Sequence, residues 1–188
     1  MDTRDEMAFR QVVTLRDGAR VLLRPLTAND RQGLMNFFLP TSQEELRFMR
    51  HNVTEPEVIN AWIDRLDYDV VFPLIAIVGD RIVGEATLHF QTGCARHRGE
   101  VRIFLAKDFR RRGLGMRLTQ SIIDIAKRRS LYLLEVQIVR DLSNDIKAME
   151  KVGFNVVCTF EDYYMLPDGE LRDVVLMLLH LRTPEGEF

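Results

Sequence analysis

The chain has 188 residues, of which 46% are hydrophobic and 29% charged, and its net charge is −2. This composition is typical of a globular protein with a substantial core, and it argues against a dedicated nucleic-acid-binding protein, which usually carries a basic excess. No apolar run approaches the ~20 residues that a membrane helix needs, and the charged start Met1–Glu6 lacks the apolar stretch of a secretory signal.

The first third of the chain predicts a strand hairpin followed by helices. Two apolar runs, Gln11–Leu15 and Arg20–Leu26, flank an Asp-Gly pair that is typical of a hairpin turn. Cap residues and prolines predict helices over three ranges: Ala28–Phe38, Glu44–Arg50 and Glu55–Leu66. We expect a single domain over residues 1–188, with 1–10 as a flexible tail.

The rest of the chain alternates strands with two helices. Strands are predicted over Val70–Val78, Ile82–Phe90, Glu100–Leu105 and Tyr132–Val139, with a closing hairpin of Phe154–Leu166 and Leu171–Leu181. Helices are predicted over Gly113–Arg129 and Asp141–Val152. This order predicts a mixed α/β fold with a mostly antiparallel sheet flanked by helices.

The segment Arg110–Gly115 joins a predicted strand to a predicted helix. Amides in the first turn of a helix lack partners inside the helix, glycines let a ligand approach them, and the helix dipole favours an anion there. Three consecutive arginines add positive charge. The segment therefore predicts a site for a pyrophosphate, although a solvated run of surface arginines is the simpler alternative.

Two common phosphate-binding motifs do not fit this segment. A Walker A loop requires Gly-x-x-x-x-Gly-Lys-Ser/Thr, which is absent from the sequence. A dinucleotide-binding fingerprint would place a third glycine at Leu118, and it would come in the first strand–helix–strand unit. Glu135 lies at the offset of the ribose-binding acid of that fold, but several strands precede the loop here.

The Arg-x-x-Gly-x-Gly pattern of Arg110–Gly115 resembles the acetyl-CoA loop of the GNAT superfamily of acyl-CoA-dependent N-acyltransferases. Asp80–Ala86 is similar to the turn of that family's strand meander, and Ile146–Phe154 to its segment of helix followed by Gly-Phe. The N-terminal stretches Thr14–Gly18 and Leu23–Leu26 resemble the start of the GNAT domain in protein lysine acetyltransferases. The resemblance implies the GNAT fold and acetyl-CoA as co-substrate.

The resemblance also implies which residues hold the cofactor. The strand before the loop would bind the pantetheine arm through the backbone of Ile103, Phe104 and Leu105. The Leu105 amide would polarise the thioester carbonyl and stabilise its developing negative charge. The pyrophosphate would be held mainly by backbone amides of one contiguous segment: Arg110, Arg111, Arg112, Gly113, Leu114, Gly115 and Met116.

Acylation needs a neutral amine, and a lysine-like amine has a pKa of about 10.4, so a general base is useful. Glu100 is the first candidate, because the base of the protein lysine acetyltransferases has a similar place. An ion pair with Arg102, two positions along the same strand, is the structural alternative. Glu85 on the neighbouring strand is the second candidate, whereas His89 is more simply a half-buried strand histidine.

Two positions depart from the family pattern. An asparagine that often contacts the cofactor is replaced by Leu142, and the tyrosine that often protonates the thiolate is replaced by Met149. Tyr163, Tyr164 or water would then donate the proton, or the thiolate would leave unassisted. A catalytically impaired acyl-CoA-binding regulatory module is therefore the alternative to an N-acetyltransferase that acts on a protein lysine or a small amine.

The remaining residues add few constraints. The histidines are scattered and the two cysteines, Cys94 and Cys158, have neither metal-ligand nor disulfide-framework spacing, so we expect no metal site and a cytoplasmic location. A homodimer is compatible with the sequence, and neither nucleic acid nor membrane is an expected partner. Six acidic residues near the expected acceptor entrance either attract a cationic amine or form a solvated rim: Glu44, Glu45, Asp67, Asp69, Glu161 and Asp162.

Overall fold

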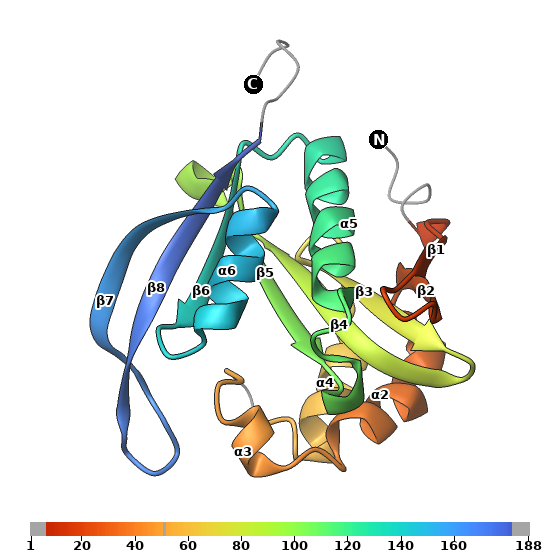
Figure 1. Ribbon diagram of the computed structural model, residues 1–188. Helices are drawn as coiled ribbons and strands as arrows, with labels where there is room; N and C mark the ends of the chain where they lie inside the picture. The colour runs from red at the N-terminus through yellow and green to blue at the C-terminus, as the bar shows by residue number, and fades with distance from the viewer. Residues whose placement is uncertain (1–6, 51, 182–188) are drawn as a thin grey trace.

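The computed structural model describes residues 7–50 and 52–181 (Figure 1). Residues 1–6 of the predicted tail, together with His51, lie outside the described residues. Within the described chain, eight strands form one sheet in the order β1-β2-β3-β4-β5-β6-β8-β7. Their bounds are Gln11–Thr14 (β1), Arg20–Pro25 (β2), Val71–Val78 (β3), Arg81–Phe90 (β4), Arg98–Leu105 (β5), Leu133–Val139 (β6), Asn155–Met165 (β7) and Leu171–His180 (β8).

All the predicted helices are present. Their bounds are Arg31–Phe38 (α2), Gln43–Leu46 (α3), Pro56–Asp64 (α4), Leu114–Arg128 (α5) and Ser143–Lys151 (α6), with short 3-10 turns at Ala28–Asp30 (η1), Gly93–Ala95 (η2) and Lys107–Phe109 (η3). The helix predicted over Glu44–Arg50 ends at Leu46, so that Arg50 lies in the loop that follows. The prediction of a mixed, mostly antiparallel α/β fold is confirmed, because only β5 and β6 pair in parallel.

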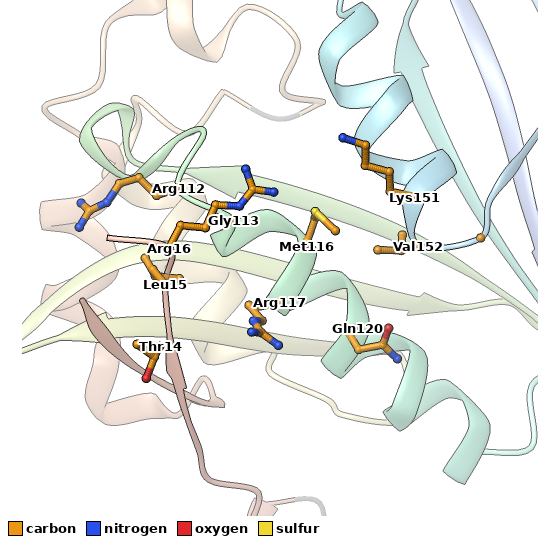
Figure 2. Close-up of a pocket in the computed structure, with 11 residues that line it drawn as sticks. Thr14, Leu15, Arg16, Arg112, Gly113, Met116, Arg117, Gln120, Lys151 and Val152 are labelled. Atoms are coloured by element: carbon orange, nitrogen blue, oxygen red, sulfur yellow. The ribbon is translucent and has the colours of Figure 1, made fainter. Parts of the chain in front are cut away.

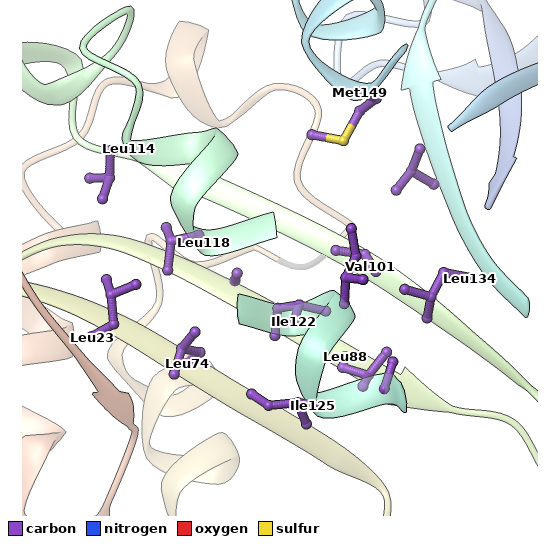
Figure 3. Packing of buried hydrophobic residues seen from close by; sticks show 14 of the residues in the cluster. Leu23, Leu74, Leu88, Val101, Leu114, Leu118, Ile122, Ile125, Leu134 and Met149 are labelled. Carbon is purple, nitrogen blue, oxygen red and sulfur yellow. The ribbon is translucent and has the colours of Figure 1, made fainter. Parts of the chain in front are cut away.

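The two faces of the sheet have separate apolar cores. Helices α5 and α6 cover one face, and the predicted stripe of Leu114, Leu118, Ile122 and Ile125 is fully buried there (Figure 3). Helices α2 and α4 cover the other face, where the rings of Phe37 and Phe38 pack against Phe104 of β5 at centroid distances of 5.6 and 5.5 Å. We call these the α5 face and the α2 face.

The parallel pairing of β5 with β6 is short. It joins only Arg98–Glu100 to Leu133–Glu135. Beyond this point β5 continues along β4 as far as Leu105, and β6 continues along β8 as far as Val139. The two strands therefore separate in the middle of the sheet and leave an opening whose edges have unpaired backbone groups.

Candidate functional site

The loop between β5 and α5 presents backbone amides. Arg111 and Gly113 have positive φ angles of 60° and 93°, and alternating backbone conformations of this kind form concave anion-binding turns. Gly113 is the N-cap residue of α5. The amides of Leu114, Gly115 and Met116 lie in the first helical turn, where no intrahelical acceptor exists. The predicted glycine loop thus has the geometry of an anion cradle.

Two of the three loop arginines make side-chain contacts within the protein. Arg110 Nε donates to the Leu105 carbonyl at 3.1 Å, and its Nη2 lies 3.0 Å from Glu45. Arg112 Nε lies 2.5 Å from Asp17 in the β1–β2 turn, and Arg112 Nη1 donates to a backbone carbonyl of η3. Of the three arginines, only Arg111 is exposed, whereas Arg110 and Arg112 are half-buried. These contacts engage both guanidinium groups within the protein, so the loop leaves its backbone amides more available than these two side chains.

A cavity of about 680 Å³ lies beside this loop (Figure 2). It runs over the outer side of α5, from the β1–β2 turn to the end of α6. Four cations line it and none of its described lining residues is acidic: Arg16, Arg112, Arg117 and Lys151 supply the charge. Among the described residues, Arg16, Arg117 and Lys151 have no ion-pair partner, in contrast to Arg112.

Sequence reasoning missed these three cations for different reasons. Arg117 lies one helical turn after Gly113 on the exposed side of α5, so helical periodicity was a usable signal. Arg16 and Lys151 are distant from the loop in sequence, and only the tertiary structure brings them to it.

The opening between β5 and β6 exposes selected backbone groups of β5. The Ala106 amide donates to the Val83 carbonyl on β4 at 3.0 Å. In an antiparallel pair, only every second residue of a strand forms backbone hydrogen bonds with a given neighbouring strand. By this alternation Phe104 bonds to β4, whereas the amides of Ile103 and Leu105 face the opening. The contact of Arg110 with the Leu105 carbonyl agrees with this direction.

Glu100 lies on the α2 face and is the last residue of β5 that pairs with β6. Its carboxylate is buried and accepts from Arg102 Nε at 3.0 Å and Nη2 at 2.9 Å. Arg50, from the loop after α3, lies 2.6 Å from the same carboxylate. Although burial opposes ionisation, the hydrogen bonds and charge of Arg102, with the charges of Arg50 and His89, hold the pKa of Glu100 below its ordinary value. The ion pair with Arg102 considered above is therefore present.

Glu85 has the opposite environment. It lies on β4 directly across from Phe104, and its side chain therefore shares the α2 face. It is 7% exposed and has neither an ion-pair nor a hydrogen-bond partner among the described residues. Burial raises the pKa of Glu85 to about 7. Thr87 and His89 follow on the same side of β4, and the Thr87 hydroxyl lies 2.9 Å from the His89 ring nitrogen.

The candidate proton donors differ in their surroundings. Met149 is buried in the core of the α5 face, and its side chain has no proton to give. Leu142 precedes α6 and is half-buried. Tyr164 donates to the side-chain oxygen of Gln137 on β6 at 3.1 Å, whereas the exposed Tyr163 has ring contacts only. Tyr164 is therefore the tyrosine that approaches the opening.

Most of the acidic residues near the expected acceptor entrance have partners. Glu44 pairs with Arg47 at 2.6 Å and Asp69 with Arg129 at 2.8 Å, in addition to the pairing of Glu45 with Arg110. Asp67 accepts the backbone amide of Asp69. Because their charges are neutralised or used locally, these residues favour the solvated rim over the attraction of a cation. Glu161 and Asp162 are exposed on β7.

A smaller cavity of about 210 Å³ reaches the end of β5 from the side of α2, where Phe37, Phe104 and Leu105 line it. No group of His, Cys, Asp or Glu side chains within the described ranges is arranged to hold a metal ion. In residues 7–50 and 52–181, no helix combines the length and apolar character that crossing a membrane requires.

Comparisons with known proteins bear on the fold and the family. A model described as "Acetyltransferase (GNAT) family" matches residues 36–154. The ribosomal-protein-alanine N-acetyltransferase from Brucella melitensis is 22% identical with a TM-score of 0.75, and the match covers 85% of this chain and 99% of that one. The GNAT domain of PAT from S. lividans is 20% identical with a TM-score of 0.76, over 92% and 97%.

A third solved structure, yncA from Salmonella typhimurium with its cofactor acetyl-CoA, is 16% identical with a TM-score of 0.75. That match covers 89% of this chain and 98% of that one. A search of curated proteins found no match. Identities of this size establish a common fold for the solved structures, and the family model covers more than half of the chain.

Proposed function

This chain belongs to the acetyltransferase (GNAT) family, and we propose that it transfers the acetyl group of acetyl-CoA directly to the nitrogen of an amine. The structural relative with bound acetyl-CoA, and the family itself, support this co-substrate. Acetyl-CoA would supply the activated thioester.

The observation that carries the proposal is the cation-lined cavity at the start of α5. A diphosphate and a further phosphate are the anionic groups of coenzyme A. Arg16, Arg117 and Lys151, which have no ion-pair partner within residues 7–50 and 52–181, match them in charge. Charge-assisted hydrogen bonds to phosphate are among the strong ones in proteins. The amides of Leu114–Met116 complete the site at the positive end of the helix dipole.

We propose that the opening between β5 and β6 holds the pantetheine arm. The amides of Ile103 and Leu105 and the Ile103 carbonyl face one edge of the opening, as the backbone groups of an exposed strand face an added one, whereas the Leu105 carbonyl accepts from Arg110 Nε. The Leu105 amide would donate to the thioester oxygen where negative charge develops. Phe104 contributes through its ring, which lies on the α2 face, because its backbone groups point toward β4 and away from the opening.

Glu100 is the proposed proton acceptor. It stands where β5 and β6 separate, on the face away from the cation-lined cavity, and Arg102 fixes its carboxylate. The low pKa keeps it ionised, so it attracts an amine and receives its proton as the nitrogen loses its positive charge. Glu85 is the alternative base. Its pKa near 7 suits proton transfer, but no hydrogen-bond or ion-pair partner among the described residues orients its carboxyl group, in contrast to that of Glu100.

The thiolate can depart without a proton donor at the position of Met149. A thiol of pKa about 8.5 is an acceptable leaving group near neutral pH. Tyr164 is the tyrosine that lies at the opening, and we propose it as the proton donor where one is used.

Two measurements test the proposal. Calorimetry should show binding of acetyl-CoA, and release of free CoA should accelerate when a lysine peptide or a small primary amine is added. Absence of heat with acetyl-CoA would remove the enzyme assignment. Binding without CoA release from any amine would instead support the regulatory module.

Replacement of Gly113 sharpens the binding test. Valine is strained at a φ of 93°, and its bulk covers the amides of the first turn, so Gly113→Val should weaken acetyl-CoA binding about 100-fold. Gly169→Val is the matched control, because Gly169 has a φ of 85° in the β7–β8 turn with open space around it. Equal binding by both variants would show that the loop amides do not hold the cofactor.

A further inference from the structure

Three oxygen atoms from three different strands converge on one nitrogen of Arg50. Arg50 Nη2 lies 2.6 Å from Glu100 Oε1 on β5, 2.8 Å from Gln137 Oε1 on β6 and 3.1 Å from the Tyr164 hydroxyl on β7. A second nitrogen of Arg50, Nη1, reaches Glu100 Oε2 at 3.3 Å. The three oxygen atoms that form this cluster belong to the strands, whereas Arg50 reaches them from a loop.

The cluster lies at the start of the opening in the sheet. Glu100 is the last residue of β5 that pairs with β6, and Gln137 lies two residues beyond Glu135, its partner. Both side chains are on the α2 face, opposite the α5 face that carries the cation-lined cavity. A group held by these oxygens would therefore approach the opening from the side away from the cofactor.

The number of oxygens suits an ammonium group better than a guanidinium group. Each terminal nitrogen of arginine carries two hydrogens, whereas a lysine ammonium carries three and has no acceptor. Three oxygens around one nitrogen at hydrogen-bond distance thus match the donors of a primary ammonium. One of the three, Glu100, also carries the negative charge that such a cation requires, and Arg102 keeps it in place.

We propose that Glu100, Gln137 and Tyr164 form the subsite for the acceptor's primary ammonium, and that Arg50 occupies this subsite as an internal substitute. Arg50 reaches the cluster through a long side chain from a surface loop, and the side chain is one-third exposed. A lysine side chain presented by a loop or peptide would enter in the same way. The inference rests on the proposed acetyl transfer and names its acceptor as lysine.

The lysine ammonium gives its first proton to Glu100, and the neutral nitrogen then forms a bond to the acetyl carbon. The bond between that carbon and the sulfur of acetyl-CoA breaks, and the sulfur leaves with the electron pair. The acylated nitrogen loses its second proton to the thiolate, and Glu100 releases the first proton to the solvent. The products are therefore an acetylated lysine, free CoA and one proton.

Removal of Arg50 should vacate the subsite. We expect Arg50→Ala to bind a fluorescent lysine peptide about tenfold more tightly than the wild-type protein, in the absence of acetyl-CoA, and to lower KM for that peptide by a similar factor. Arg47→Ala is the matched control, because Arg47 lies in the same segment but pairs with Glu44 and Glu170. Weaker peptide binding by Arg50→Ala than by Arg47→Ala would overturn the proposal.

A second variant converts the internal substitute into an acceptor. Arg50→Lys places a primary amine one bond short of the present guanidinium nitrogen, so position 50 should become acetylated when acetyl-CoA is added. Mass spectrometry of proteolytic fragments would locate the added acetyl group. Arg47→Lys should remain unmodified at position 47, and Glu100→Gln in the Arg50→Lys background should abolish the modification.

The two variants separate this inference from the proposed function. Calorimetry with acetyl-CoA and CoA release with small amines report the function itself. If both persist while position 50 stays unmodified and Arg50→Ala gains no peptide affinity, the lysine subsite is wrong and the transferase assignment stands. If acetyl-CoA fails to bind any variant, the proposed function fails first.

Discussion

The two sides of the opening between β5 and β6 differ in whether their positively charged side chains contact a carboxylate. On the α5 face, Arg16, Arg117 and Lys151 line a cavity without acidic residues and have no ion-pair partner in the described chain. On the α2 face, Arg50 and Arg102 both contact one carboxylate. The same residue type therefore has two uses within one site.

This difference follows from the cost of leaving charges unpaired. Cations that stay exposed retain their hydration and remain available to an anionic ligand, whereas a buried carboxylate requires compensation by nearby cations. The α5 face is thus suited to the phosphates of a cofactor, and the α2 face to the positioning of Glu100. Three experiments test whether this division of charge is functional.

The largest effect is expected at the carboxylate. Glu100→Gln removes the charge that attracts the amine and the site that receives its proton, so kcat should fall about 10²-fold or more. Acetyl-CoA affinity, which we propose depends on the other face, should stay nearly unchanged. Steady-state kinetics with calorimetry measures both quantities.

Glu135→Gln is the control for the loss of an ion pair, because Glu135 faces Glu100 across the β5–β6 pair and contacts Arg98 at 3.4 Å. Unaltered kcat in Glu100→Gln would remove Glu100 from the mechanism and leave Glu85 as the base. A parallel loss of acetyl-CoA affinity would contradict the separation of the two faces.

The second-largest effect is expected in the pH dependence of the free energy of unfolding. The pKa of Glu85 rises from 4.5 to about 7 on folding, so between these values the folded state binds more protons than the unfolded state. Stability should therefore fall as the pH rises through this window. Relative to Glu85→Gln, the wild-type protein should lose about 3 kcal/mol between pH 4.5 and pH 8, measured by urea unfolding.

Glu100 should make stability depend on pH in the opposite direction in the same experiment. Its pKa is lowered on folding, so relative to Glu100→Gln the wild-type protein should lose stability as the pH falls through the pKa of the folded state. If the stability difference between wild type and variant changed with pH in the same direction for Glu85→Gln and Glu100→Gln, Glu85 would be hydrated in the folded protein. Its pKa would then not be raised by burial.

The smallest effect is expected on the cofactor side. Arg16→Glu should weaken acetyl-CoA binding about tenfold or more, since one hydrogen bond to a charged group contributes roughly 1.5–3 kcal/mol, and the affinity should become less dependent on salt. Arg20→Glu, in the same hairpin but outside the cavity, makes the same change in net charge. Equal losses in both variants would mean that only the overall charge matters.

Much of the fold could be predicted from local sequence patterns. The Asp-Gly hairpin, the stripe from Leu114 to Ile125 and the glycine loop each depend on residues close in sequence, where turn preferences and periodicity act directly. The helix after Ser42 was predicted too long. It ends at Leu46, and after it come the tertiary contacts of Arg47 with Glu170 in the β7–β8 turn and of Arg50 with Glu100 on β5.

The sequence by itself determined the succession of strands and helices and the position of the glycine loop, because short-range sterics, helix capping and apolar periodicity fix these locally. Only the tertiary structure decided where β5 and β6 separate, which cations remain unpaired and which carboxylate is neutralised. These properties depend on Arg16, Lys151, Arg50 and Tyr164, which approach the site from distant parts of the chain. Burial and electrostatic pairing arise between such residues only after the sheet has formed.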